Sequence, residues 1–260
     1  MPHLTVEVRG FNLVLDHITN KKSISIIIPA RNEEDNIQRS IDASIYAAEK
    51  NFNEYEIFVV NDGSTDNTLQ IVEKNIRTNN KIRVISHPVS LGFGVAFDTG
   101  RKDAKMNYTV MVHGDDVFER EDLSLFFSYA GKADMILGFI ENPESRSKAR
   151  QAISTLYTKI MNSIFRLDLK YFNGIQIHVS EWMKRLDLYS DGFGFFAEIV
   201  IKAVREGRSY LEVPYKHRER PSGGVTKIFR VKNIESVIKT IIHLYLWHMK
   251  NPDHKKMTIS

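Results

Sequence analysis

Residues 23–33 read SISIIIPARNE, and this stretch indicates the fold class of the chain. Its apolar part, residues 24–28, is short, rich in β-branched side chains and stopped by Pro29, which is typical of a buried strand in a parallel sheet. The polar residues 32–35 then supply a helix cap and a first turn. Apolar side chains recur at helical spacing from Ile37 to Ala48. A strand followed at once by a helix is the first unit of a βαβ series.

The same alternation continues along the first half of the chain. Residues 56–60, 82–85 and 108–112 are expected strands, with helices expected at 69–76 and 96–106. Such a series forms a twisted, mostly parallel sheet flanked by helices, so we predict a Rossmann-like α/β fold. Beyond that point the expected elements are a helix at 122–129, a strand at 134–139, a polar loop at 141–148, helices at 153–164 and 195–206, and a strand at 211–213.

We expect one main domain, because no internal repeat, low-complexity tract or flexible linker interrupts the chain. It comprises residues 23–230, with a nucleotide-binding half at about 23–116 and an acceptor half at about 117–230. Residues 1–22 are an N-terminal extension with an edge strand or a hairpin. Residues 231–260 form an amphipathic C-terminal helix and tail. We expect that helix to pack on its own domain or on a second subunit of a homodimer, and contact with a membrane interface is the alternative.

Composition excludes several classes of protein. An apolar content of 42% over 260 residues is enough for a buried core. A net charge of +4 without a groove-reading module argues against nucleic acid as a partner. The absence of cysteine removes disulfides and thiolate zinc sites and is compatible with a reducing cytoplasm. With neither a secretory leader nor about 20 consecutive apolar residues, we expect a cytoplasmic protein, soluble or peripheral on the inner face of a membrane.

Three polar segments follow expected strands: residues 29–33, 61–64 and 113–116. The carboxyl ends of parallel strands lie at one edge of a sheet, so we expect these segments to meet in space. Carboxylates gathered there repel one another unless they hold a cation or accept hydrogen bonds from groups such as ribose hydroxyls. A nucleoside diphosphate with a divalent ion supplies both. Each segment alone is more often a turn or a helix cap, so the inference rests on their shared position.

The order of these segments resembles the family 2 glycosyltransferases of the GT-A fold, and among them the polyprenyl-phosphate sugar synthases such as the dolichol-phosphate mannose synthases. In that family the first strand ends in Pro-x-x-Asn-Glu and the second in Asp-Gly-Ser-x-Asp. Here residues 29–33 and 62–66 match both segments. Residues 90–96 resemble the family's glycine-rich loop, with Ser90 in place of an asparagine. The resemblance covers roughly residues 23 to 230.

This resemblance implies an inverting, metal-dependent hexosyltransferase. It would move a sugar from a nucleoside-diphosphate sugar to a polyprenyl-phosphate or saccharide acceptor in cell-envelope or glycan biosynthesis. The residues implied to bind the donor are Pro29, Ala30, Arg31, Glu33, Asp62, Ser64, Gly92 and Gly114.

The family's Asp-x-Asp triplet is altered, because His113-Gly114-Asp115 stands in its place. By resemblance, Asp115 is the catalytic carboxylate that contacts the metal bridging the diphosphate. His113 is expected to ligate the same metal as neutral imidazole or to bond the ribose, and Asp116 is a substitute ligand. Imidazole accepts Mn²⁺ more readily than Mg²⁺, although either ion is a candidate cofactor.

The second half extends the resemblance through residues 191–198, 212–214 and 218–227. Glu198 lies in the family's Phe-x-x-Glu helix start. We interpret it either as the base that deprotonates an acceptor hydroxyl or as a helix-start carboxylate; an acceptor phosphate would need no base. The family also has an aspartate before a Gly-Phe segment in the middle of the chain, and no such aspartate is evident near residues 170–175. The residues implied to hold the diphosphate or an acceptor phosphate are Arg150, Arg218, Arg220 and Lys227.

Three other functions compete with this interpretation. A dinucleotide-dependent dehydrogenase is disfavoured, because Phe97 replaces the third glycine of its fingerprint and the loop follows the third strand. A sugar-phosphate nucleotidyltransferase shares the sheet and the metal carboxylate, but it usually places the glycine-rich loop directly after the first strand. A non-catalytic nucleotide-sugar binding module is conceivable because of His113.

Overall fold

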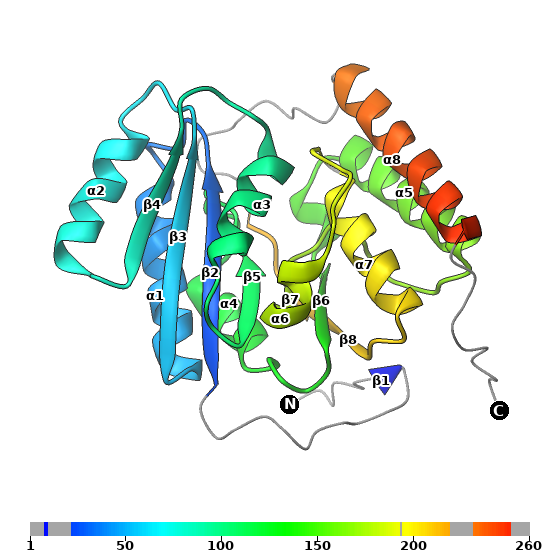
Figure 1. Ribbon diagram of the computed structural model, residues 1–260, viewed down its shortest axis with the longest axis horizontal. Coiled ribbons are helices and arrows are strands. Elements are labelled where there is room, and N and C mark those ends of the chain that lie inside the picture. Colours follow the sequence, from blue (N-terminus) through cyan, green and yellow to red (C-terminus); the bar gives the residue numbers. More distant parts are fainter. Residues whose placement is uncertain (1–7, 10–21, 193, 219–230, 251–260) are drawn as a thin grey trace.

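The computed structural model describes residues 8–9, 22–192, 194–218 and 231–250 (Figure 1). These residues build one eight-stranded sheet with the strand order β1-β8-β6-β7-β5-β2-β3-β4. The strands are β1 (Val8–Arg9), β2 (Ser23–Ala30), β3 (Glu54–Asp62), β4 (Ile82–His87), β5 (Tyr108–Met111), β6 (Met135–Ile140), β7 (Gln176–Val179) and β8 (Tyr210–Tyr215).

Helices cover both faces of the sheet, as the βαβ pattern predicts. One face carries α1, α2 and α4, and the other carries α3 and α5 to α8. The helices are α1 (Ile37–Asn51), α2 (Thr68–Thr78), α3 (Phe93–Asp103), α4 (Arg120–Phe127), α5 (Lys148–Phe165), α6 (Ser180–Arg185), α7 (Phe195–Arg205) and α8 (Val231–Lys250), with a short 3₁₀ helix at Pro143–Ser145.

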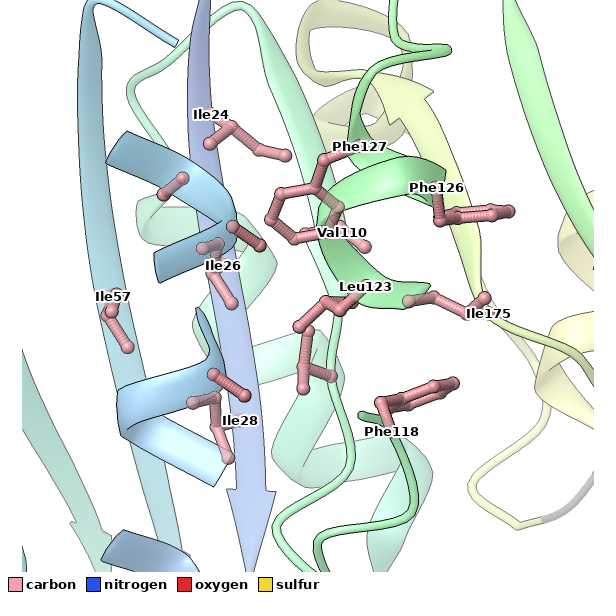
Figure 2. Close-up of a cluster of buried hydrophobic side chains, with 14 of the residues drawn as sticks. Ile24, Ile26, Ile28, Ile57, Val110, Phe118, Leu123, Phe126, Phe127 and Ile175 are labelled. Atoms are coloured by element: carbon pink, nitrogen blue, oxygen red, sulfur yellow. The ribbon is translucent and has the colours of Figure 1, made fainter. Parts of the chain in front are cut away.

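Strand β2 is the centre of the core because all eight of its residues are buried. Its even-numbered isoleucines, from Ile24 to Ile28, pack against α4 through Leu123 and Phe127, as Figure 2 shows. Its odd-numbered Ile27 faces the second cluster, beneath α3 and α7. Burial on both faces explains why the run is almost continuously apolar, and it fixes the register of the flanking strands.

The predicted fold class is confirmed, with two additions to the expected elements. The pairs β2–β3, β3–β4, β2–β5 and β6–β8 are parallel. Strand β7 was not expected; it lies between β5 and β6 and runs antiparallel to both. Helix α6, which follows it directly, was not expected either. Strand β1 is an edge strand antiparallel to β8, one of the two alternatives for the N-terminal extension. The expected C-terminal helix is α8.

Candidate active site

The loops that follow β2 and β3 are joined by hydrogen bonds at one edge of the sheet. Asn32, in the left-handed region with a φ of 55°, donates its N–H to Ser64 Oγ (3.0 Å) and accepts from the N–H of Thr65 (2.8 Å). The N–H of Glu33 donates to Thr68 Oγ1 at 2.8 Å. The structure therefore brings the predicted donor residues Pro29, Ala30, Arg31, Glu33, Asp62 and Ser64 into one region.

Asp62, at the end of β3, organises the glycine-rich loop. Its carboxylate accepts from Ser90 Oγ (2.7 Å), from the N–H groups of Leu91 (2.8 Å) and Gly92 (3.0 Å), and contacts His87 Nδ1 at 2.8 Å. Burial alone would raise the pKa of Asp62, but these bonds outweigh it and hold the pKa below its ordinary value. Gly92 has a φ of 110°, which favours glycine. Asp62 thus shapes the loop from within, and direct contact with a donor stays a prediction.

The end of β5 lies against the end of β2. A Cβ on Gly114 would stand 3.1 Å from the carbonyl oxygen of Pro29 and 3.3 Å from the Cβ of Ala30, so only glycine fits this approach comfortably. The next residue, Asp115, is 5% exposed. The third polar segment therefore lies at the same edge of the sheet as the other two. This is the arrangement that we predict from the position of each segment at the end of a strand.

Asp116 is engaged by two guanidinium groups. Its Oδ2 accepts from Arg39 Nε at 2.6 Å and lies 3.4 Å from a terminal nitrogen of Arg218. Its N–H donates to Ser40 Oγ at 3.0 Å, and its φ of 55° turns the chain away from β5. This pairing does not support the expectation that Asp116 is a substitute metal ligand. It leaves Asp115 as the candidate metal carboxylate.

His113 lies among aromatic side chains. Its ring stacks on Phe93 with a centroid distance of 5.3 Å and an interplanar angle of 17°. It also makes tilted contacts with Phe118 (6.2 Å) and Phe196 (6.3 Å). Because Phe93 is the first residue of α3, directly after Gly92, this stacking connects the altered triplet to the glycine-rich loop.

Two arginines, Arg146 and Arg150, give the site a cationic side near His217, which lies two residues beyond β8. Burial, together with the charges of Arg146 and Arg150, lowers the pKa of His217 to about 4, while Asp115 acts on it in the opposite direction. These side chains therefore lie close enough to influence one another electrostatically. His217 is neutral at neutral pH as a result. His217 was not expected as a site residue, because it lies within a cluster of basic residues in the sequence. Its position just after a strand is the feature that could have identified it.

Glu198 does not lie open to an acceptor. Its side chain is 0% exposed, and its carboxylate accepts from the N–H groups of Tyr189 (2.9 Å) and Ser190 (2.8 Å) and from Lys202 Nζ (2.6 Å). These three donors occupy both oxygens. These contacts do not favour Glu198 as the catalytic base and fit the helix-start alternative, because the carboxylate anchors residues 189–190 to the first turn of α7. A catalytic role of Glu198 stays a prediction.

The structure describes two of the predicted phosphate-binding residues, Arg150 and Arg218. Arg150 lies in the first turn of α5 and acts electrostatically on His217, and Arg218 pairs with Asp116 and with Glu119 at 3.3 Å. Arg220 and Lys227 lie outside the described residues.

The side chains near the end of β5 include the types of atom that bind a divalent cation. Asp115 offers carboxylate oxygen, and His113 and His217 offer imidazole nitrogen, which together suit Mn²⁺. In the described parts of the chain, however, no three histidine or acidic side chains converge closely enough to form a ready-made metal cluster. A cation at this edge would therefore also need oxygen ligands from a bound phosphate, as is common for ions that act with phosphate substrates.

None of the helices in the described part of the chain combines the length and the apolar character that crossing a bilayer requires.

Known proteins show the same fold and related sequences. Glucosyl-3-phosphoglycerate synthase from Mycobacterium tuberculosis, crystallised with phosphoglyceric acid, superposes with a TM-score of 0.65 at 18% identity and covers 90% of this chain and 82% of its own. Another crystal of that enzyme holds Mn²⁺, UDP-glucose and phosphoglyceric acid, with a TM-score of 0.61. At this identity the likeness shows the GT-A fold.

Two curated relatives match part of the sequence. Hyaluronan synthase of Pasteurella multocida is 33% identical over 109 residues, which are 42% of this chain and 11% of the synthase. Dolichyl-phosphate beta-glucosyltransferase ALG5C of Trichomonas vaginalis is 28% identical over 138 residues, which are 49% of this chain and 41% of that enzyme. The chain thus spans less than half the length of either relative. The model of the family described as Glycosyl transferase family 2 matches residues 25–189, more than half of the chain. The chain belongs to glycosyl transferase family 2.

Proposed function

We propose that the chain is an inverting, metal-dependent glycosyltransferase that moves a sugar from a nucleoside-diphosphate sugar to the phosphate group of a lipid-linked acceptor. One observation carries the choice of acceptor. Two carboxylates of this region, Glu198 and Asp116, are engaged by basic side chains, whereas Arg146 and Arg150 act electrostatically on His217, which Asp115 also influences. A hydroxyl acceptor needs a base, but a phosphate is already anionic at neutral pH.

In this proposal the first two strand ends hold the nucleotide and Arg146 and Arg150 hold the acceptor phosphate. An oxygen of that phosphate attacks the anomeric carbon opposite the leaving group. The bond from that carbon to the diphosphate breaks with its electron pair, which inverts the configuration and releases a nucleoside diphosphate. A divalent cation bound by Asp115, with His113 or His217 as a further ligand, would supply Lewis-acid stabilisation of the departing diphosphate.

The names of related proteins support a phosphate-bearing acceptor. ALG5C is called a dolichyl-phosphate glucosyltransferase, and the structurally similar synthase is crystallised with phosphoglyceric acid. Crystals of that synthase with UDP-glucose also make UDP-sugars the first donors to test. The proposed setting is cell-envelope or glycan biosynthesis, at the inner face of a membrane, and a saccharide hydroxyl is the alternative acceptor.

The test is an incubation with UDP- and GDP-sugars, Mn²⁺ or Mg²⁺, and either a short-chain polyprenyl phosphate or an oligosaccharide. We expect nucleoside diphosphate to be released only with the polyprenyl phosphate and a metal ion. Pyrophosphate released from a sugar phosphate and a nucleoside triphosphate would identify a nucleotidyltransferase instead. Binding of nucleotide sugar without turnover on either acceptor would identify a binding module.

Two variants assign the roles within this assay. Asp115→Asn should abolish the metal-dependent part of the thermal stabilisation by nucleotide, while Asp103→Asn, an exposed carboxylate near the end of α3, should leave it unchanged. Arg150→Gln should raise KM for the acceptor at least about tenfold, because a hydrogen bond to a charged group contributes about 1.5–3 kcal/mol. An unchanged acceptor KM, or a loss of donor affinity instead, would contradict the assignment.

A further inference from the structure

Exposed apolar side chains are concentrated on two helices. Of the twelve large apolar side chains that are exposed in the described part of the chain, eight lie on α5 and α8. On α5 they are Ile153, Leu156 and Ile160; on α8 they are Ile238, Ile242, Tyr245, Leu246 and Met249. A surface of this kind on a soluble domain marks a site of interaction. These eight residues are called the α5–α8 surface below.

The spacing shows that each helix presents one continuous row. Successive members are three or four residues apart on α5, and the same holds from Ile238 to Tyr245 on α8, so each row follows one side of its helix. The opposite sides face inward, where Met161 and Leu244 are both 0% exposed. Packing against the domain therefore accounts for one side of α8 and leaves the other without a partner among the described residues.

Helices α5 and α8 overlap in Figure 1, and they meet at their carboxyl ends. At their carboxyl ends the ring of Phe165 lies 6.1 Å from that of His248, and Arg205 donates to the carbonyl of Phe165 at 2.9 Å. At its amino end α5 starts beside the candidate site, since Arg150 acts on His217. In the middle of α8, Thr240 donates to Ser190 Oγ at 3.1 Å. The next residue of that loop, Asp191, accepts from the N–H of Gly94 through its carbonyl oxygen.

Charge identifies what this surface binds. Helix α5 contains no acidic residue but carries Lys148, Arg150 and Lys159. Helix α8 contains one acid, Glu235, which pairs with Lys239 at 2.7 Å, and it ends in Lys250. Apolar rows flanked by basic residues match a bilayer surface with anionic headgroups. A second copy would bring the same basic helices face to face, where like charges repel, so this surface does not suit a homodimer.

We propose that the α5–α8 surface docks on an anionic membrane, with the apolar rows in the headgroup layer and the lysines against the lipid phosphates. Helix α5 begins near the candidate site, and the middle of α8 contacts the loop that supports it, so docking would hold that site beside the membrane. The docking rests on the proposed function, because a lipid-linked acceptor has to be reached in the plane of a membrane. The eight residues of the surface are not among the candidate site residues.

The test measures flotation of the full chain with phosphatidylcholine vesicles, with and without phosphatidylglycerol. We expect binding to the anionic vesicles only, weakened by salt. The double variant Leu156→Ser with Ile242→Ser should lower the partition coefficient about tenfold or more. The matched control is Leu125→Ser, which removes an equally exposed leucine from α4, on the other face of the sheet, and should bind like the parent chain.

Three results would overturn the docking. They are equal binding to neutral vesicles, undiminished binding by the double variant, and a dimer in light scattering that the double variant dissociates, which would make the surface a subunit interface. Turnover with polyprenyl phosphate in detergent reports separately on the proposed function. Loss of vesicle binding with intact turnover overturns the docking alone, and vesicle binding without turnover overturns the proposed function alone.

Discussion

Lys202 Nζ lies 2.6 Å from Glu198 Oε1, one turn earlier on α7, and both side chains are buried. The same carboxylate accepts the N–H groups of Tyr189 and Ser190. Residue 191 follows directly, and its carbonyl accepts from the N–H of Gly94 at 3.1 Å in the glycine-rich loop. A buried ion pair therefore positions a loop that supports the candidate donor site, although neither member of the pair faces that site.

The first prediction separates this anchoring role of Glu198 from catalysis. Glu198→Gln leaves the Lys202 ammonium buried without its counter-charge, so the free energy of unfolding should fall by about 3 kcal/mol in urea titrations. The turnover of the folded fraction should change by no more than a few-fold. Loss of a general base would instead lower kcat by about 10²–10⁴. The control is Glu181→Gln, because Glu181 forms an exposed pair with Arg185 and should change stability by less than about 0.5 kcal/mol.

The fold is predictable from sequence where each strand is an apolar run that ends at a polar loop. Strand β7 breaks this rule. Gln176 and His178 alternate with apolar residues over only four positions, yet both polar side chains are buried. Gln176 donates to the carbonyl of Phe172 at 3.0 Å, and its own side-chain oxygen contacts His178 Nε2 at 3.0 Å. Burial of these groups depends on partners supplied by the tertiary structure, which the local pattern does not reveal.

The acidic side of the candidate site is also predictable, because Asp62 and Asp115 each follow an apolar run. Of the cationic side, the resemblance predicts Arg150 but neither Arg146 nor the neighbouring His217. His217 reaches that side through β8, which extends beyond the expected strand, and through a pair of hydrogen bonds with Asn142, 75 residues earlier. Asn142 lies just before the 3₁₀ helix that leads to Arg146. Contacts between segments so far apart in sequence follow from the β6–β8 pairing and not from any motif.

The second prediction concerns the pH dependence of stability that His217 contributes. The folded-state pKa of about 4 lies below the ordinary value of 6.5. Between these values the unfolded chain binds a proton that the folded chain does not, so this contribution is complete above pH 6.5 and is lost as the pH falls toward 4. The free energy of unfolding of His217→Gln should therefore fall by about 1–2 kcal/mol less than that of the parent chain between pH 6.5 and pH 4. This figure allows for the partial exposure of the side chain.

Urea unfolding at several pH values tests this second prediction, and NMR titration of the histidine Cε1–H signals locates the pKa directly. His178 contributes in an overlapping window, because burial and Arg208 lower its pKa to about 3. The variant should therefore keep part of the acid sensitivity of the parent chain. A His217 signal that titrates near its ordinary pKa would contradict the proximity of Arg146 and Arg150.

The third prediction concerns Asp62 and the glycine-rich loop. Because the pKa of Asp62 is lowered in the folded state, the stability it contributes is present above its ordinary pKa near 3.9 and is lost as the pH falls through the lower folded value. Asp62→Asn places an amide NH₂ against donors such as the N–H of Gly92. We expect a loss of about 1–3 kcal/mol at neutral pH and a smaller acid-induced decline than in the parent chain, measured by urea unfolding. A variant as stable as the parent chain would refute the role of Asp62 as loop organiser.

The fourth prediction asks what the histidine of the altered triplet contributes. His113→Phe keeps an aromatic ring stacked on Phe93 but removes both nitrogens, so the free energy of unfolding should stay within about 1 kcal/mol of the parent value. The Mn²⁺-dependent part of the stabilisation by nucleotide should weaken about tenfold in apparent metal affinity. His113→Asp restores an oxygen ligand and should shift the preference toward Mg²⁺, at the cost of the stacking. If His113→Phe keeps the full Mn²⁺ dependence, His113 only packs against the loop, and the cation depends on Asp115, His217 and the phosphates of the substrate.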